Sequence, residues 1–305
     1  MKVFVAGATG VVGRRLIPLL VDAGADVTAV ARTDSKASQL KKQGARPMRV
    51  DLFDPARVEE AVAGHDAVIN VATKIPSGAR VLMPGAFKEN IRIRTEASQN
   101  IASAAISARA RVFIQESFAP VYPDRGSEWI DETVPIQPAS YVRSVMDAES
   151  AADEFTKSGG RGVVLRFSMF YGPDSSLTLD MVNAVKRGFA PALGGGDAYM
   201  SSLWTDDAAS AVFAALSVPA GAYNVSDDEP MPRRDVFTLL AQELGVKPPR
   251  ILPRWASMMM GSVADTVGRS HRISNAKFRQ AANWIPKIPS VREGWRLLVE
   301  EMGGT

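Results

Sequence analysis

The feature that most constrains this chain is a glycine-rich turn directly after its first apolar run. Val3–Ala6 is typical of a buried strand, and a helical pattern follows over 13–23. Glycines spaced in this way let backbone N–H groups and a helix N-terminus approach a pyrophosphate, which side chains would obstruct. A tight turn without a ligand is the alternative. Because the motif opens a strand–turn–helix unit, we predict that it binds a dinucleotide, with the contacts made by Gly7, Thr9, Gly10, Val11, Val12 and Gly13.

Short β-branched runs alternate with longer helical patterns over the first two-thirds of the chain. This alternation is typical of a parallel sheet that is covered by helices. Further strands are predicted at 27–31, 47–50, 67–71, 111–115 and 162–167, and long helices at about 85–107 and 140–158. The sequence therefore predicts an α/β fold, a Rossmann-type doubly wound parallel sheet with a small C-terminal α/β substrate lobe.

The regular alternation ends after Gly172-Pro173, where Pro, Met and Trp become more frequent. We expect a dinucleotide-binding domain over 1–173, to which 204–227 returns as a helix, a turn and a strand. Segments 174–203 and 228–305 would form the substrate-binding lobe. An apolar substrate pocket or a lid could be formed by Trp129, Trp204, Trp255 and Met258–Met260, but methionine runs are more often adaptable core.

Composition excludes several classes of site. The chain has no cysteine and only two histidines, His65 and His271, which excludes disulfides, a thiol nucleophile, cysteine-ligated metals and a histidine-rich metal site. We therefore expect no metal. The net charge of +3 is too small and too scattered to indicate nucleic-acid binding. No stretch resembles a signal peptide or a membrane span, so we expect a cytoplasmic location.

The end of the second predicted strand favours one nicotinamide cofactor over the other. An NAD site places an acidic residue there to hold the ribose 2′-hydroxyl. This chain has Arg32 instead and no acid until Asp34, and a guanidinium suits a 2′-phosphate. A solvated arginine is the alternative. We predict NADP, with NAD less favoured, and further cofactor contacts from Asp51 and Leu52 at the adenine edge and from Val71, Ala72, Thr73 and Tyr141.

Several motifs along the chain give it a family resemblance. The sequence shows the turn GATGVVG, Leu165-Arg166 followed by Tyr171-Gly172-Pro173, the run Trp204-Thr205-Asp206-Asp207-Ala208 and Tyr223-Asn224-Val225. With these motifs it resembles an extended or atypical short-chain dehydrogenase/reductase of the NAD-dependent epimerase/dehydratase group. The resemblance implies a cofactor lying across the crevice between the two parts of the chain. It also implies a homodimer formed through the helices at 85–107 and 140–158.

The catalytic residues that the resemblance implies are incomplete. Members of that group use a Tyr-x-x-x-Lys pair on a helix together with a Ser or Thr after the fifth strand. Here the tyrosine is Tyr141, but the lysine position is Val145 and the Ser/Thr position is Phe118, with Ser117 one residue earlier. The missing cation favours a tyrosine that donates a proton over one that removes a proton.

Two charged residues are candidates to replace the missing groups. Lys74 follows the fourth predicted strand at the edge where the nicotinamide would lie, although a solvated loop lysine is the more ordinary interpretation. Glu116 could act as an acid or base beside the substrate. We favour the alternative in which it caps the backbone or pairs with Arg166.

Three functions are compatible with these sequence features. The first is an NADP-dependent oxidoreductase that reduces a carbonyl or an activated double bond of an apolar small molecule, with Tyr141 as proton donor. The second is a catalytically silent NADP-binding sensor or scaffold. The third is a non-redox isomerase or lyase with Glu116 as base. Turnover of the reduced cofactor separates the first from the other two.

Overall fold

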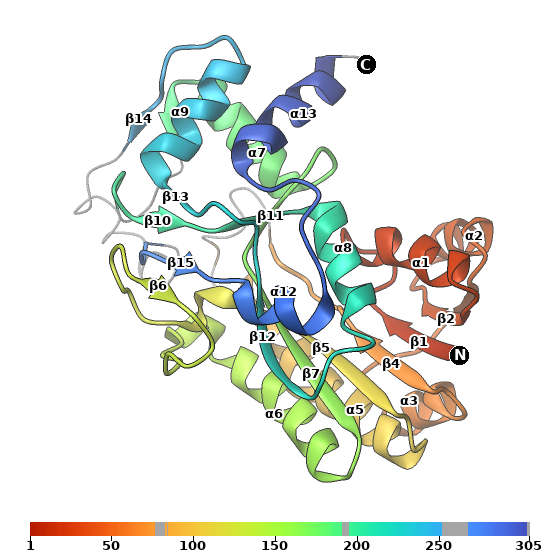
Figure 1. Cartoon of the computed structure of the whole chain (residues 1–305). Coiled ribbons are helices and arrows are strands. Elements are labelled where there is room, and N and C mark those ends of the chain that lie inside the picture. The colour runs from red at the N-terminus through yellow and green to blue at the C-terminus, as the bar shows by residue number, and fades with distance from the viewer. Residues whose placement is uncertain (77–82, 84, 191–194, 252–267, 304–305) are drawn as a thin grey trace.

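A parallel sheet of seven strands lies at the centre of the chain (Figure 1). The computed structural model describes residues 1–76, 83, 85–190, 195–251 and 268–303, without the side chain of Tyr141. The order of the strands in the sheet is β12-β7-β5-β4-β1-β2-β3. Their bounds along the chain are β1 (Lys2–Ala6), β2 (Asp26–Val30), β3 (Arg46–Met48), β4 (Ala67–Asn70), β5 (Val112–Phe118), β7 (Arg161–Phe167) and β12 (Gly221–Val225).

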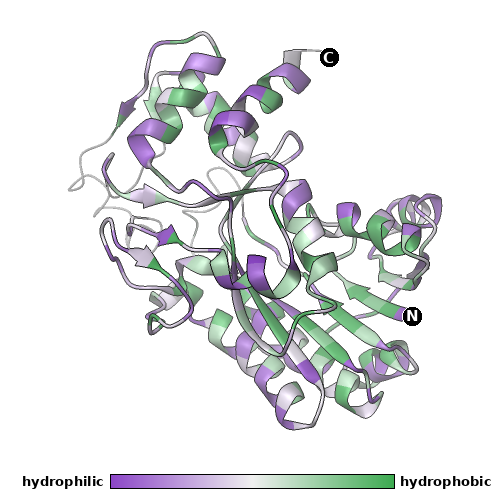
Figure 2. Cartoon of the chain, viewed as in Figure 1, coloured by the Kyte–Doolittle hydropathy of each residue, from purple (hydrophilic) through white to green (hydrophobic). Residues whose placement is uncertain are grey.

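Helices cover both faces of the sheet, because its strands carry apolar residues on both sides. In Figure 2 the central strands are mostly coloured as hydrophobic, and hydrophilic residues gather on the outer sides of the helices. One face packs against α1 (Gly13–Asp22), α2 (Asp34–Lys42), α8 (Thr205–Ala214) and α12 (Ala276–Ala282). The other face packs against α3 (Pro55–Val62), α5 (Ser98–Ser107) and α6 (Ser144–Lys157). The predicted Rossmann-type doubly wound sheet is confirmed.

Three further helices gather beyond the carboxyl ends of the strands: α7 (Ser176–Lys186), α9 (Arg233–Glu243) and α13 (Val291–Gly303). They share an apolar core of their own, in which Tyr171 packs edge-on against Trp204 and Trp295 at centroid distances of 5.2 and 4.9 Å. Short strand pairs form separate two-stranded sheets outside the central sheet: β8 (Met169–Tyr171) with β11 (Ser202–Trp204), β10 (Tyr199–Met200) with β13 (Met231–Pro232), β9 (Phe189–Ala190) with β14 (Arg250–Ile251), and β6 (Trp129–Ile130) with β15 (Arg272–Ile273).

The division into two domains stays a prediction, although the structure adds detail to it. The segment predicted to return to the sheet does so, since β12 pairs with β7 and α8 packs on α1. Part of the predicted substrate lobe also lies on the sheet, because Phe278 and Trp284 belong to its core. Trp255 and Met258–Met260 lie outside the described residues. No helix within the described ranges is long and apolar enough to cross a membrane.

A π-helical turn interrupts the helix predicted at 85–107. The helix runs as α4 (Lys88–Arg92), then a π turn over Ile93–Ala97, then α5. Such turns inside helices occur often at functional sites. Within this turn Arg94 is 4% exposed and reaches a glutamate of β5.

A buried polar network fixes the carboxyl ends of the central strands. Arg166 of β7 donates to both carboxylate oxygens of Glu149 on α6, at 2.9 and 2.6 Å, and to the Tyr122 hydroxyl at 2.8 Å. The same carboxylate accepts from the Ser117 hydroxyl at 2.5 Å. Tyr122 in turn donates to Asn224 of β12 at 2.9 Å. The pair at its centre is about one-tenth exposed, so each charge depends on the other for its solvation.

We therefore expect Glu149→Gln to destabilise the protein strongly. The substitution leaves the Arg166 guanidinium buried without its counter-charge, which costs about 3–5 kcal/mol in comparable pairs. Urea unfolding measures the difference. Glu60→Gln, which breaks the exposed Arg57–Glu60 pair, is the matched control and should change the unfolding free energy by less than about 1 kcal/mol. Equal effects of the two variants would contradict the structural role of the network.

Candidate functional site

The glycine turn holds β1, β4 and α1 in backbone contact. Gly7 has φ of +84°, and a Cβ atom there would lie 2.5 Å from the backbone C and O atoms of Val71. A Cβ atom on Gly13 would lie 2.2 Å from the Gly7 oxygen. Both positions therefore require glycine for close packing and, at Gly7, for the backbone conformation. They bring the first helix directly onto the ends of two neighbouring strands.

The outer side of the same turn is open. Gly10 is exposed, and a Cβ atom on it would meet only the Gly7 oxygen, at 3.2 Å. No side chain caps the N-terminus of α1, and its first turn contains no acidic residue. An open backbone at an uncapped helix N-terminus is suited to an anionic group. The turn thus fits the pyrophosphate of a dinucleotide.

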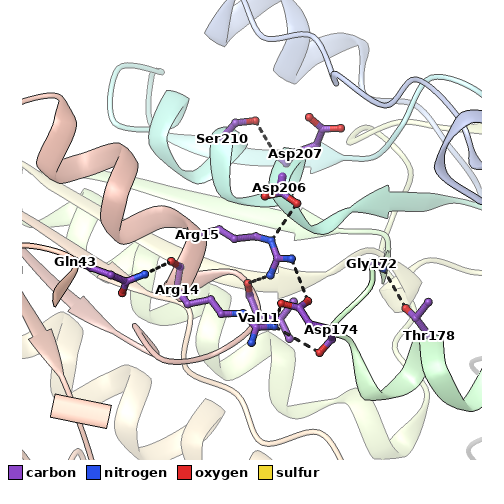
Figure 3. A network of polar contacts seen from close by, with 10 residues as sticks. All are labelled: Val11, Arg14, Arg15, Gln43, Gly172, Asp174, Thr178, Asp206, Asp207 and Ser210. Carbon is purple, nitrogen blue, oxygen red and sulfur yellow. Dashed lines mark hydrogen bonds and ion pairs between the residues drawn. The ribbon is translucent and has the colours of Figure 1, made fainter. Parts of the chain in front are cut away.

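Two arginines after the turn connect α1 to the rest of the site (Figure 3). Arg14 contacts the Asp174 carboxylate at 2.5 Å, and Arg15 contacts it at 3.0 Å. Arg15 also contacts Asp206, at the start of α8, at 3.0 Å, and donates to the Val11 carbonyl at 3.1 Å. These contacts tie the glycine turn to the segment that follows β8 and to the helix that follows β11.

Arg32 follows β2, where the sequence predicts the 2′-phosphate contact. Its side chain is 71% exposed and lies 3.7 Å from the Glu89 carboxylate of α4. Asp34 begins α2 and pairs with Arg49 at 2.7 Å. Asp34, the first acid after the strand, is therefore held by another arginine, and Arg32 is the first charged residue after the strand in the sequence.

Lys74 pairs with the same Glu89 carboxylate, and its backbone N–H donates to Asn90 at 2.9 Å. The structure brings this lysine toward Arg32 through their shared partner. Its catalytic assignment stays a prediction.

The other predicted cofactor residues line the edge of the sheet around the turn. Asp51 is exposed and accepts from the Phe53 N–H at 3.0 Å, and the Leu52 carbonyl accepts from Asn100 at 3.0 Å. Val71, beside Gly7, is 9% exposed, and the next two residues, Ala72 and Thr73, are partly buried.

A cavity of about 130 Å³ lies beyond the ends of β5 and β7. Ligands of open α/β sheets bind at this edge. Segments far apart in the sequence line it: Phe118, Ala119, Pro120, Ser168, Met169, Leu177, Met181, Tyr199, Met200, Ser201, Arg233, Phe237, His271 and Ile273. Tyr199 thus lines the cavity, whereas Tyr171 belongs to the core.

The two positions that depart from the catalytic pattern lie in one apolar cluster. Val145 is fully buried there among Val121, Val142 and Ile273, and Phe118 packs against the same cluster. At the position of the expected lysine, the Val145 side chain thus makes apolar packing contacts. Tyr141 lies in a short 3₁₀ turn over Ser140–Val142 just before α6, and its side chain lies outside the described part of the structure.

Glu116 and Ser117 both have buried partners. Glu116 is 7% exposed and accepts from Arg94 at 3.3 Å. The expected pairing with Arg166 is wrong, because Arg166 pairs with Glu149. Ser117 is fully buried in the network with Glu149 and is not among the described residues that line the cavity. Catalytic roles for these two residues stay predictions.

A strongly desolvated cation belongs to the described lining of the cavity. Arg233 is 5% exposed, and burial lowers its pKa to about 10 although the Asp124 charge acts in the opposite direction. Burial also lowers the pKa of His271 to about 4, so this imidazole is neutral at pH 7. Its Nε2 lies 3.0 Å from the Tyr122 carbonyl, an acceptor, which identifies Nε2 as the protonated nitrogen.

Sequence reasoning missed Arg15, Glu89, Arg94, Ser168 and Arg233. Only Arg15 had a usable signal, since it follows the glycine turn immediately. The others act through contacts between segments that the sequence does not relate. Among the described residues no group of acidic and histidine side chains is arranged to hold a metal ion.

Curated relatives match most of the chain. A 3-diazoavenalumate denitrifying reductase from Streptomyces sp is 32% identical over 311 residues, which cover 96% of this chain and 99% of that protein. A 2-alkyl-3-oxoalkanoate reductase from Stenotrophomonas maltophilia is 27% identical and covers 82% of this chain and 77% of its own length. The chain is thus similar to proteins that are named as reductases.

Solved structures share the fold over the full length. A UDP-glucose 4-epimerase from Thermus thermophilus in complex with NAD has a TM-score of 0.80 at 23% identity, with all of both chains covered. The human epimerase family protein SDR39U1 with NADPH has a TM-score of 0.79 at 19% identity, with 98% of this chain and 99% of that chain covered. The sequence profile of the NAD dependent epimerase/dehydratase family matches residues 3–226. With the glycine turn, the seven-stranded sheet and this match in agreement, the chain belongs to the NAD-dependent epimerase/dehydratase family.

Proposed function

We propose that this protein is an NADPH-dependent reductase that acts on a carbonyl or an activated double bond of an apolar small molecule. One observation carries the proposal. The open glycine turn after β1 and the apolar cavity beyond β5 and β7 lie at the same carboxyl edge of the sheet. A cofactor and a substrate bound at these two places would meet in the crevice between them. The reductase names of the two relatives support this choice.

The residues around the turn would hold the cofactor. Backbone N–H groups of Thr9, Val11, Val12 and Gly13 would bind the pyrophosphate, because the Gly10 N–H donates to the Gly7 carbonyl at 3.0 Å. Arg32 would pair with the 2′-phosphate. Asp51 and Leu52 would border the adenine of the cofactor. Val71, Ala72 and Thr73 would contact the remainder of the cofactor. Bound NADPH supplies a hydride, that is two electrons and one proton, to the substrate carbon.

Reduction also requires a proton on the substrate oxygen, and we assign its delivery to Tyr141. A phenol hydroxyl can act as a general acid toward a developing alkoxide. Val145, at the position where the family pattern has its lysine, is buried in an apolar cluster, so this position supplies no cation that would stabilise a phenolate. This chemistry favours reduction of a carbonyl over oxidation of an alcohol.

A second candidate function is a nucleotide-binding sensor or scaffold without turnover. The apolar cluster around Phe118 and Val145 favours it, because both positions lack the polar groups of the catalytic pattern. A homodimer through α5 and α6 and a cytoplasmic location belong to both proposals. A Glu116-based isomerase is less favoured, because Arg94 engages that carboxylate.

Arg32→Ala should weaken NADPH binding by about tenfold or more and leave NADH binding unchanged, because only NADPH carries the 2′-phosphate. Isothermal titration calorimetry with both nucleotides measures the change. Arg57→Ala is the matched control, since the Arg57 side chain is equally exposed, at 69% against 71%, and lies on α3. A uniform loss for both nucleotides would reject the 2′-phosphate contact.

NADPH oxidation in the presence of apolar ketones and enones tests the reaction itself. We expect at least one of them to be reduced, and Tyr141→Phe to lower kcat by about 10²–10⁴-fold without weakening NADPH binding. Tyr223→Phe is the control, because the Tyr223 hydroxyl donates to the Pro219 carbonyl and does not line the cavity as described. NADPH binding without any oxidation across the panel would favour the sensor.

A further inference from the structure

We propose that the cavity beyond β5 and β7 selects apolar carboxylic acids, with Arg233 pairing with the carboxylate and the Ser168 hydroxyl bonding to a further ligand oxygen. This inference rests on the proposed function in one respect, namely that the cavity binds the substrate. It adds the chemical class of the ligand, which neither the family nor the fold specifies.

The walls of the cavity require a mainly apolar ligand. Phe118, Leu177, Met181, Met200, Phe237 and Ile273 contribute hydrocarbon or thioether surface from five different elements. The volume of about 130 Å³ is close to that of an engineered cavity of about 150 Å³ that binds benzene. A ligand with one aromatic ring or a short alkyl chain therefore matches the size.

Arg233 makes this apolar site selective for an anion. It begins α9 and is 5% exposed. Its Nη1 and Nη2 donate to the backbone carbonyls of Gly268 at 3.1 Å and Arg269 at 2.5 Å. These bonds hold the guanidinium in one orientation, which lowers the entropic cost of binding a ligand. The Asp124 charge also acts on this guanidinium. A carboxylate that enters would meet a preorganised donor group in a medium of low polarity, where charge-assisted hydrogen bonds are strong.

No second described cation competes for this role in the lining. His271 is the other ionisable nitrogen group there, and it is neutral at pH 7, with Nε2–H directed at the Tyr122 carbonyl. The anion preference of the described lining thus depends on one side chain, and a substitution can test it.

Ser168 provides an independent observation that points to a ligand. It directly follows β7, lines the cavity and is 2% exposed, yet its Oγ has no hydrogen-bond partner in the described structure. A buried hydroxyl without a partner is energetically costly, and a ligand oxygen would remove that cost. Phe118, at the family's Ser or Thr position, is paired in register with Phe167 of β7. Ser168 therefore lies on the neighbouring strand, one residue beyond the partner of that position.

The experiment compares trans-cinnamate with its neutral isostere trans-cinnamamide. Isothermal titration calorimetry on the full chain, with and without NADP⁺, measures both affinities. We expect cinnamate to bind the wild-type protein at least tenfold more tightly than cinnamamide. Arg233→Gln should weaken cinnamate binding by roughly 10- to 100-fold and leave cinnamamide binding nearly unchanged.

Arg234→Gln is the matched control, because Arg234 is the next residue of the same helix and its exposed side chain pairs with Asp197. It should preserve the preference for the acid. Ser168→Ala should weaken both probes by several-fold. If Arg233→Gln does not fold, the wild-type comparison of the two probes and the Ser168→Ala variant still decide the question.

Equal binding of acid and amide to the wild-type protein would overturn the inference, as would failure of cinnamate to bind at millimolar concentration. Retention of the acid preference in a folded Arg233→Gln variant would also overturn it. These outcomes are independent of reductase activity. If the protein binds NADPH and reduces ketones but does not distinguish acid from amide, the proposed function stands and this inference fails. If the protein prefers the acid but oxidises no NADPH, this inference stands and the proposed function fails.

Discussion

The backbone contact between Gly7 and Val71 determines where both halves of the site lie. A side chain at Gly7 would overlap the Val71 carbonyl group, so β1 and β4 can meet at this closeness only with glycine there. These two strands are neighbours at the point where the strand order reverses, which in open α/β sheets opens a crevice at the carboxyl edge. Arg14 and Arg15 then tie the start of α1 to Asp174 and Asp206. Because those acids belong to segments that lead toward the cavity, the position of the turn and the position of the cavity are coupled.

Both positions that depart from the family's catalytic pattern are apolar. Phe118 and Val145 lie far apart in the sequence but contact one apolar cluster, so hydrocarbon occupies both of the positions at which that pattern has a hydroxyl and an ammonium group. A lysine at Val145 would have to bury its charge among Val121, Val142 and Ile273, which is costly without a counter-charge. The buried polar network of Glu149 and Arg166 lies beside this region and stabilises the strand ends. The polar network and the apolar cluster thus adjoin at this edge of the sheet, where Tyr122 belongs to both.

The turns and most strands of this structure could be predicted from the sequence, whereas the contacts between residues that are distant in the chain could not. The glycine turn and the strands of the central sheet follow from periodicity and turn chemistry, which depend on neighbouring residues. The strand predicted at 111–115 in fact extends to Phe118. The sequence did not indicate this extension, because Gln115, Glu116 and Ser117 are polar. Their buried partners, Asn70, Arg94 and Glu149, are distant in the chain. For the same reason the pairing of Glu116 with Arg166 was wrong. The cavity brings together residues from 118 to 273, and no sequence pattern relates Arg233 to Ser168.

Whether the open turn after β1 binds a nicotinamide dinucleotide is the central question about this protein. The direct measurement is a titration of the purified wild-type chain with NADPH and, separately, with NADH, followed by quenching of tryptophan fluorescence. We expect saturable binding at one site per chain, with NADPH bound more tightly than NADH. Absence of saturable binding for both nucleotides would contradict this expectation, because the glycine turn would then serve only the close packing of β1, β4 and α1.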